Sequence, residues 1–126
     1  MKKLLILVPV LLAVLSFTVF AQMSPTITAQ PAATTIVFAG FIDGNLTVGA
    51  SAAGGQTPSF QWFRNTANSN VGGTAIAGAT GASFPIPRNL PPGEHFFFSE
   101  VRSGGATIRS NVAMVRVFDF EECDLC

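Results

Sequence analysis

The two cysteines of this 126-residue chain, Cys123 and Cys126, lie at its C-terminal end among the acids Glu121, Glu122 and Asp124. Their Cys-x-x-Cys spacing fits three kinds of chemistry: a local disulfide in an oxidising compartment, half of a four-cysteine zinc site completed elsewhere, or a thiol redox pair. A redox pair is normally activated by a helix N-terminus, whereas acidic neighbours disfavour the thiolate. The redox interpretation is therefore the weakest. We expect the pair to offer attachment to another chain and to add nothing to the stability of the fold.

His95 is the single histidine, and as a general base or a metal ligand it would need carboxylate partners. Glu94 and Glu100 are the nearby candidates, but strand alternation places both on the face opposite His95. The sequence shows no Ser-His-Asp arrangement with a glycine elbow and no phosphate-binding glycine loop. We therefore predict a non-enzymatic protein without a metal or cofactor. The glycosylation-type tripeptide that begins at Asn45 is interpreted as the start of a strand.

The first residues read as an export signal. Lys2 and Lys3 precede an apolar run from residue 4 to 20, which ends in the small-residue pattern of a cleavage site at Ala21. An uncleaved membrane anchor is the alternative, but the run contains Pro9 and has no polar stop-transfer flank. We predict a signal peptide over residues 1–21, cleaved after Ala21, and a secreted or cell-surface protein that contacts the membrane only during export.

The remaining chain has the length of one domain, with a body over residues 22–117 and an acidic tail over 118–126. Because the tail follows directly on the last predicted strand, we expect it to be the start of a further region in a longer gene product. The whole chain has seven basic and seven acidic residues and a net charge of +0. The arginines of the body are scattered and do not form the dense basic stripe that phosphate binding requires, so a nucleic-acid partner is not expected.

Strand-like runs separated by turn residues fill the body, and none of its apolar patterns keeps a helical period for three turns. The centre is Phe60-Gln61-Trp62-Phe63-Arg64, an alternating run around the single tryptophan. The glycines at 104 and 105 predict a hairpin between the two runs that flank them. The sequence thus predicts an all-β protein whose strands occupy residues 24–31 continued by 34–38, 46–50, 59–64, 83–86, 95–102 and 107–117.

The order and spacing of five short motifs resemble the bacterial immunoglobulin-like (Ig-like) domains of exported and surface proteins. The motifs are Gln30-Pro31, Gly40, the Phe-x-Trp-Phe run at 60–63, the Ile-x-Gly-Ala-Thr run at 76–80, and the Gly-x-His-Phe run at 93–96. The resemblance covers about residues 24–117. It implies an Ig-like β-sandwich of about seven strands, built around a tryptophan on the third strand.

The resemblance also implies the core. We expect Trp62, Phe60, Phe97 and Val48 to be its anchors, with Val48 and Phe97 facing the tryptophan. Because these two positions are apolar, no disulfide can join the sheets there, and the core must depend on burial alone. The chain has no tyrosine, so the tyrosine hydroxyl that often bonds the strand corner of such sandwiches is missing. His95 occupies the matching place and is expected to donate a ring hydrogen bond to the corner backbone.

These features predict a non-catalytic module for adhesion, binding or spacing, with a protein or glycan ligand at a surface. A carbohydrate-binding module is the alternative, in which Phe63 and either Phe96 or Phe98 would be exposed as a sugar platform. Such platforms favour tryptophan and tyrosine, which argues against it. A thiol-redox or metal-binding function through the Cys123 and Cys126 pair is the third and least favoured possibility.

Overall fold

The structure, a computed structural model, describes residues 24–120. The predicted signal peptide and the cysteine pair lie outside the described residues. The described part is almost all strand and turn, as expected for a chain rich in β-branched and aromatic residues between glycines and prolines. In chain order the strands are β1 (Thr26–Ala29), β2 (Thr34–Phe38), β3 (Asn45–Thr47), β4 (Gly49–Ser51), β5 (Ser59–Asn65), β6 (Thr74–Ala75), β7 (Ser83–Pro85), β8 (Gly93–Ser103), β9 (Ala106–Arg109) and β10 (Ala113–Phe118), with a 3₁₀ turn at Ala53–Gly55.

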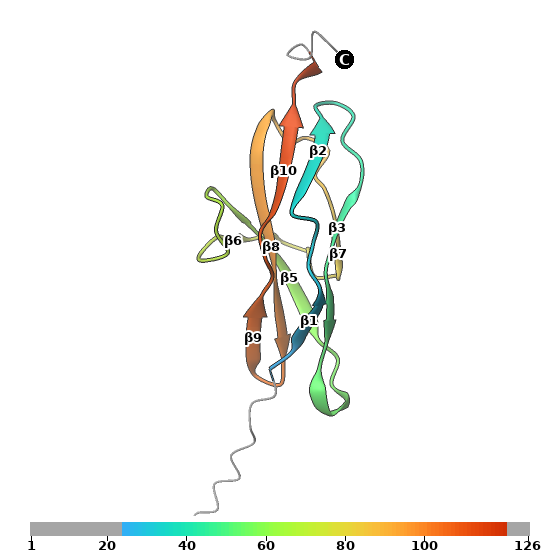
Figure 1. Cartoon of the computed structure of the whole chain (residues 1–126), viewed down its shortest axis with the longest axis vertical. Coiled ribbons are helices and arrows are strands. Elements are labelled where there is room, and N and C mark those ends of the chain that lie inside the picture. Colours follow the sequence, from blue (N-terminus) through green and yellow to red (C-terminus); the bar gives the residue numbers. More distant parts are fainter. Residues whose placement is uncertain (1–23, 121–126) are drawn as a thin grey trace, which may run out of the picture.

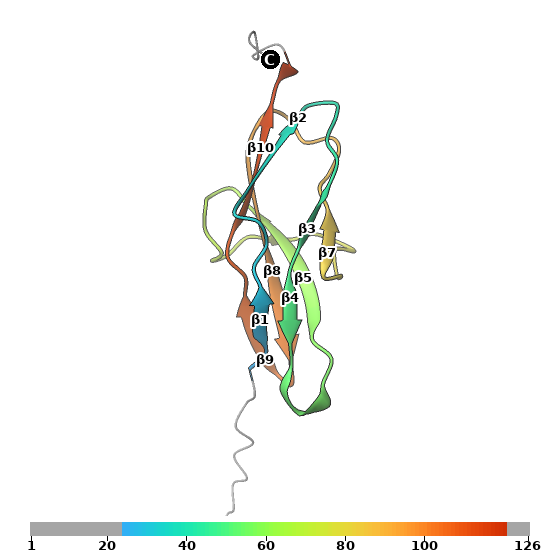
Figure 2. The same cartoon turned by 45° about the vertical axis from the view of Figure 1, so that its right-hand side comes forward.

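The strands form two layers, the arrangement predicted for a β-sandwich (Figure 1). One layer is a six-stranded sheet in the order β2-β10-β8-β5-β6, with β9 also paired to β8. The other layer consists of two short ladders, β1-β4 and β3-β7, which follow one another along the same side of the large sheet (Figure 2). If β1 and β2, β3 and β4, and β9 and β10 are each counted as one interrupted strand, the described residues contain seven strand segments, the number that the Ig-like resemblance implies. β6 is the one segment that was not among the predicted runs.

The first strand changes layer between its two halves. β1 pairs antiparallel with β4, whereas β2 pairs in parallel with β10. The prediction of one continuing edge strand over these two halves is therefore wrong. The buried Pro31 lies between them and has no backbone N–H to donate, so a continuous ladder cannot pass through it. β2 therefore becomes the outermost strand of the large sheet.

Two further predicted strands are interrupted. The run at 46–50 is divided at Val48, whose N–H bonds to Ala82 O at 2.9 Å, so β3 pairs with β7 and β4 pairs with β1. The run at 107–117 is divided at Ser110, and both β9 and β10 pair with β8. The predicted hairpin is confirmed, because Gly104 and Gly105 form its two-residue turn with φ of +56° and +84°.

The core lies between the layers around Trp62, which is completely buried. Its ring stacks on Phe84 with centroids 5.6 Å apart, and its Nε1–H donates to Gly81 O at 2.9 Å. The structure places Phe97 and Val48 in the same buried cluster, while Phe60 is half-buried at its margin. The other buried members of the cluster are Val37, Ile42, Leu46, Ile86, Ala113, Val115 and Val117.

Ser99, and not Phe97, lies directly across the ladder from Trp62. Phe97 lies two residues before Ser99 on the same face of β8, in the buried cluster that contains Trp62. Ser99 is completely buried, and its Oγ has no hydrogen-bond partner among the described residues. Ser110 is equally buried, but its Oγ accepts from Ser99 N–H at 2.9 Å and donates to Asn111 O at 2.9 Å. These two serines thus share burial and differ in whether the hydroxyl is bonded.

We expect Ser99→Ala to raise the free energy of unfolding by up to about 1 kcal/mol, because it removes a buried hydroxyl that gains nothing from the fold. Ser110→Ala is the matched control and should lower the free energy of unfolding by roughly 1–3 kcal/mol, because it leaves the Ser99 amide without its acceptor. Urea unfolding of the two variants measures both effects. Equal destabilisation of the two would show that the Ser99 hydroxyl is bonded in solution.

Candidate functional site

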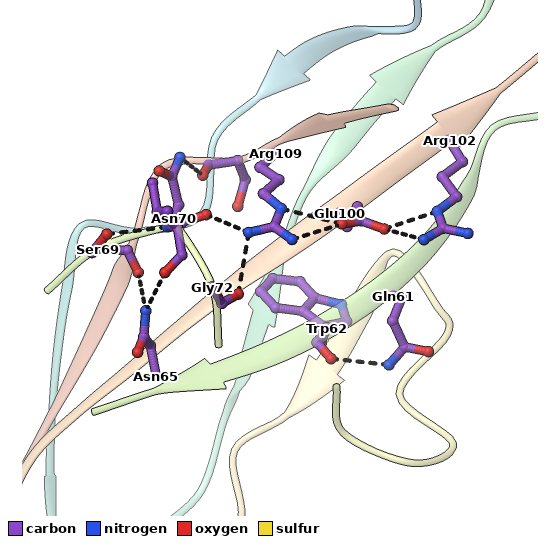
Figure 3. A network of polar contacts seen from close by, with 11 residues as sticks. Gln61, Trp62, Asn65, Ser69, Asn70, Gly72, Glu100, Arg102 and Arg109 are labelled. Atoms are coloured by element: carbon purple, nitrogen blue, oxygen red, sulfur yellow. Dashed lines mark hydrogen bonds and ion pairs between the residues drawn. The ribbon is translucent and has the colours of Figure 1, made fainter. Parts of the chain in front are cut away.

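The charged groups on the outer face of the large sheet converge on Glu100. This carboxylate is only 4% exposed, although strand alternation puts it on the solvent side of β8. Arg102 donates to its Oε1 from Nε at 2.8 Å, and Arg109 reaches its Oε2 from Nε at 3.1 Å and from Nη2 at 3.1 Å (Figure 3). Both carboxylate oxygens are therefore paired. Glu100 is not free to act as a base or as a metal ligand.

Arg109 also fastens the loop between β5 and β6 to the sheet. Its Nη1 donates to Asn70 O at 2.7 Å and to Gly72 O at 3.1 Å (Figure 3). Its guanidinium lies 5.2 Å from the ring centre of Phe63 and 5.0 Å from that of Phe98, and these two rings stack on each other at 5.2 Å. One side chain thus joins the acid, the aromatic pair and the loop.

The loop itself is closely packed. Asn65 Nδ2 donates to Ser69 O at 2.8 Å and to Val71 O at 3.1 Å, which holds the loop closed from within. Asn70 Nδ2 donates to Ser110 O at 3.0 Å. A Cβ added at Gly73 would lie 3.1 Å from the ring of Phe98, so the backbone touches that ring. The loop therefore covers the middle of the outer face.

Because the loop covers this face, one of the three phenylalanines expected to form an exposed sugar platform is not exposed. Phe98 is completely buried beneath the loop and beneath Arg109. Phe63 and Phe96 are each half-buried, and Phe63 has one ring face occupied by Phe98. A platform for a sugar ring needs adjacent exposed aromatic faces, and these three residues do not supply them.

His95 lies in the first part of β8, and its Nε2–H donates to Pro91 O, in the corner before the strand, at 2.7 Å. The predicted hydrogen bond from His95 to the corner backbone is confirmed. The ring also lines an open groove of about 1120 Å³ between β6, the start of β8 and the 87–91 corner, which contains Arg64 and Glu94 as its charged groups. Within residues 24–120, no three His, Cys, Asp or Glu side chains gather as a metal site would require.

Four phenylalanines gather where the described chain ends, and we call them the aromatic pole: Phe38, Phe41, Phe118 and Phe120. Phe38 lies 6.2 Å from Phe118 and 6.5 Å from Phe120, and Phe41 lies 6.0 Å from Phe120, measured between ring centres. Phe41 is 75% and Phe120 66% exposed. The aromatic pole is thus an apolar patch at one end of the sandwich.

Sequence reasoning identified neither the Glu100 cluster nor the aromatic pole. The cluster depends on the β8–β9 register, which brings Arg109 opposite Glu100. The sequence contained part of this information, because a two-residue turn at Gly104 and Gly105 pairs residue 103 with 106 and, three residues further along each strand, Glu100 with Arg109. For the aromatic pole, the sequence offered one indication: Phe118 and Phe120 follow Val117, the last residue of the core.

Residues 24–120 contain no helix long and apolar enough to span a bilayer. No protein-family model matches the chain, and no curated protein matches it at a significant level. Solved structures do. The chain is 17% identical to an Ig domain from a complex of titin M10 with obscurin-like 1, with a TM-score of 0.54, and the match covers 75% of this chain and 93% of that one.

Two other similar structures agree. In the tandem Ig repeats of Dlar the identity is 16% and the TM-score 0.56, and the match covers 77% of this chain and 47% of that one. In the PKD domain of human KIAA0319 the identity is 16% and the TM-score 0.55, with 81% and 89% of the two chains covered. Identities this low establish the fold alone. The chain therefore adopts an Ig-like β-sandwich fold.

We expect Arg109→Ala to lower the free energy of unfolding by about 2 kcal/mol, because it leaves the buried Glu100 with one unpaired oxygen and releases the loop. Arg102→Ala is the matched control on the same carboxylate. Its side chain is 64% exposed, against 32% for Arg109, so its loss should cost less than about 1 kcal/mol. Urea unfolding gives the two values, and amide hydrogen exchange in residues 66–73 should accelerate in the first variant alone. Equal effects on both would contradict the anchoring role of Arg109.

Proposed function

We propose that this chain is an exported, non-catalytic Ig-like module that serves as an interaction or spacer domain of a bacterial secreted or cell-surface protein. One observation carries this proposal: the described chain enters the sandwich at β1, at one end, and leaves it after β10, at the opposite end (Figure 1). A domain threaded in this way extends the distance between whatever precedes and follows it. It also presents its loops and its outer strands along the length of the molecule.

The state of the polar side chains supports a module without catalysis. Glu100 is paired with two arginines, and His95 donates a hydrogen bond to a backbone carbonyl. Arg109 donates hydrogen bonds to the β5–β6 loop. Each of these groups holds the fold in place. A general base or nucleophile needs a side chain that is free to meet a substrate.

Protein is the partner class that we propose in preference to glycan. The three phenylalanines expected to form a sugar platform are covered or half-covered, and the exposed apolar side chains of the described residues are Ile36, Phe41, Val71 and Phe120. Ile36, Phe41 and Phe120 belong to an outer strand and to the aromatic pole. Exposed apolar patches of this kind are typical of protein contacts. One similar structure is itself a complex of titin M10 with obscurin-like 1.

The export part is tested by expressing the full chain in a bacterial host and measuring the intact mass of the product. We expect a chain that starts at Gln22, recovered outside the cytoplasm, because the leader is removed on translocation. The double variant Lys2→Glu, Lys3→Glu should stay in the cytoplasm with its leader. The matched control, Arg64→Glu with Arg88→Glu, makes the same change in charge at exposed positions of the sandwich and should be exported normally. A membrane-bound product that retains residues 1–21 would establish an anchor instead.

The partner class is tested by affinity electrophoresis of the exported chain through gels that contain soluble polysaccharides. We expect unchanged mobility relative to gels without polysaccharide, because no pair of exposed aromatic faces is available at 63, 96 and 98. Retardation that Phe96→Ala abolishes, and that Val71→Ala leaves in place, would favour the carbohydrate-binding alternative. Val71 is a suitable control because it is 77% exposed and lies in the covering loop.

A further inference from the structure

β2 is an outer strand without protection. It consists of Thr34-Thr35-Ile36-Val37-Phe38, and it has one paired neighbour, β10. Its residues are β-branched or aromatic, and it contains no charge, proline or glycine. Ile36 is 58% exposed in the middle of the strand. A strand with these properties is a template on which another strand can pair.

The backbone groups on the open side of β2 follow from its ladder with β10. Met114 N–H bonds to Ala33 O at 3.0 Å, and Ala39 N–H bonds to Phe118 O at 2.9 Å. Odd-numbered residues of this strand therefore direct their N–H and C=O groups toward β10, because these directions alternate along a strand. The N–H and C=O groups of Thr34 and Ile36, and the N–H of Phe38, point to the open side.

Other outer strands of the described residues are protected. β1 lies between Pro25 and Pro31 and has an irregular register with β4. β7 contains Pro85, β6 has two residues only, and β3 and β4 have three residues each. β9 ends in the charged Arg109. Proline, short length, irregularity and charge are the means by which sheets prevent pairing at their edges, and β2 has none of them.

We propose that β2 pairs antiparallel with β2 of a second copy of this chain, around a two-fold axis at Ile36. At a two-fold axis the central residue faces its own copy, so a charge at that position would be repelled. The central residue of β2 is the apolar Ile36, and the strand carries no charge. The predicted mature chain retains five arginines and seven acids, a net charge of −2, so long-range repulsion between copies is small. This inference is independent of export and goes beyond the proposed function.

The geometry of the pairing is specific. Ile36 would lie opposite Ile36 of the second copy, and Thr34 opposite Phe38. Thr34 and Ile36 direct both their N–H and C=O groups to the open side, and Phe38 directs its N–H there while its C=O accepts from Phe41 N–H. Both pairs therefore fall at hydrogen-bonded positions of the antiparallel ladder. β-branched and aromatic residues that face each other across strands stabilise the pairing. The exposed Ile36 side chain is thereby covered.

The association is tested by sedimentation equilibrium of the exported, mature chain from micromolar to millimolar concentration. We expect a monomer–dimer equilibrium, weak because a five-residue strand buries little area. Ile36→Lys should lower the association constant by at least about tenfold, because it puts two like charges at the axis. Val71→Lys, the control, makes the same change at an exposed apolar residue away from β2 and should leave the constant unchanged.

A cross-link identifies the register without relying on a destabilised variant. In a chain with Cys123→Ser and Cys126→Ser, Ile36→Cys should form a symmetric disulfide dimer under mild oxidation, and Val71→Cys should not. A monomer at every concentration would overturn the proposal, as would a dimer that Ile36→Lys leaves intact. A dimer abolished only by Phe41→Ser with Phe120→Ser would overturn it too, because the interface would then be the aromatic pole.

Discussion

The packing of the Trp62 indole between the two layers is the contact on which the rest of the described structure depends. The ring is completely buried, stacks on Phe84 of the smaller layer, and is held by its Nε1–H bond to Gly81 O. Across the ladder stands Ser99, and the surrounding core residues are aliphatic or aromatic. Cohesion between the layers therefore comes from apolar burial, which has no preferred direction and depends on close packing. The hydrogen bond from the indole N–H to the Gly81 carbonyl fixes the orientation of the ring.

Ion pairs and cation–π contacts, and not apolar burial alone, stabilise the outer face of the large sheet. Burying the Glu100 carboxylate alone would cost free energy, and ion pairs with two arginines offset that cost. One of them, Arg109, also donates to loop carbonyls and lies over two stacked rings. The result is a loop that follows the sheet closely instead of projecting from it. These charged side chains thus determine the shape of the surface.

What remains for contact with other molecules is at the margins. Apart from Val71 in the β5–β6 loop, the exposed large apolar side chains of the described residues lie on β2 and at the aromatic pole, and a mixed groove opens beside the corner at His95. β2 is the edge strand of the large sheet because the chain changes layer at Pro31. A first strand that stayed in the smaller layer would have left β10 as the edge of the large sheet. A local restriction on hydrogen bonding therefore determines which strand faces solvent with its backbone groups free.

The fold class, the central strand and the hairpin could be predicted from the amino-acid sequence, because each has a local cause. Alternation around Trp62 makes a strand with one buried face, and the two glycines at 104 and 105 supply the positive φ of a tight turn. The bond from His95 to Pro91 O was predictable for the same reason, since a ring four residues from a carbonyl at a corner can reach it.

Only the tertiary structure decided which residues meet across strands. Alternation puts Glu100 and Phe98 on the outward side, and this is correct for the strand, but the loop from β5 to β6 returns over Phe98, and two arginines enclose Glu100. Likewise the β5–β8 register places Ser99 directly across the ladder from Trp62, because a shift of two residues along a strand preserves the face and changes the partner. The four rings of the aromatic pole come from two segments far apart in the sequence, which the parallel β2–β10 pairing brings together. Register and loop path arise from contacts between distant segments, and no local pattern records them.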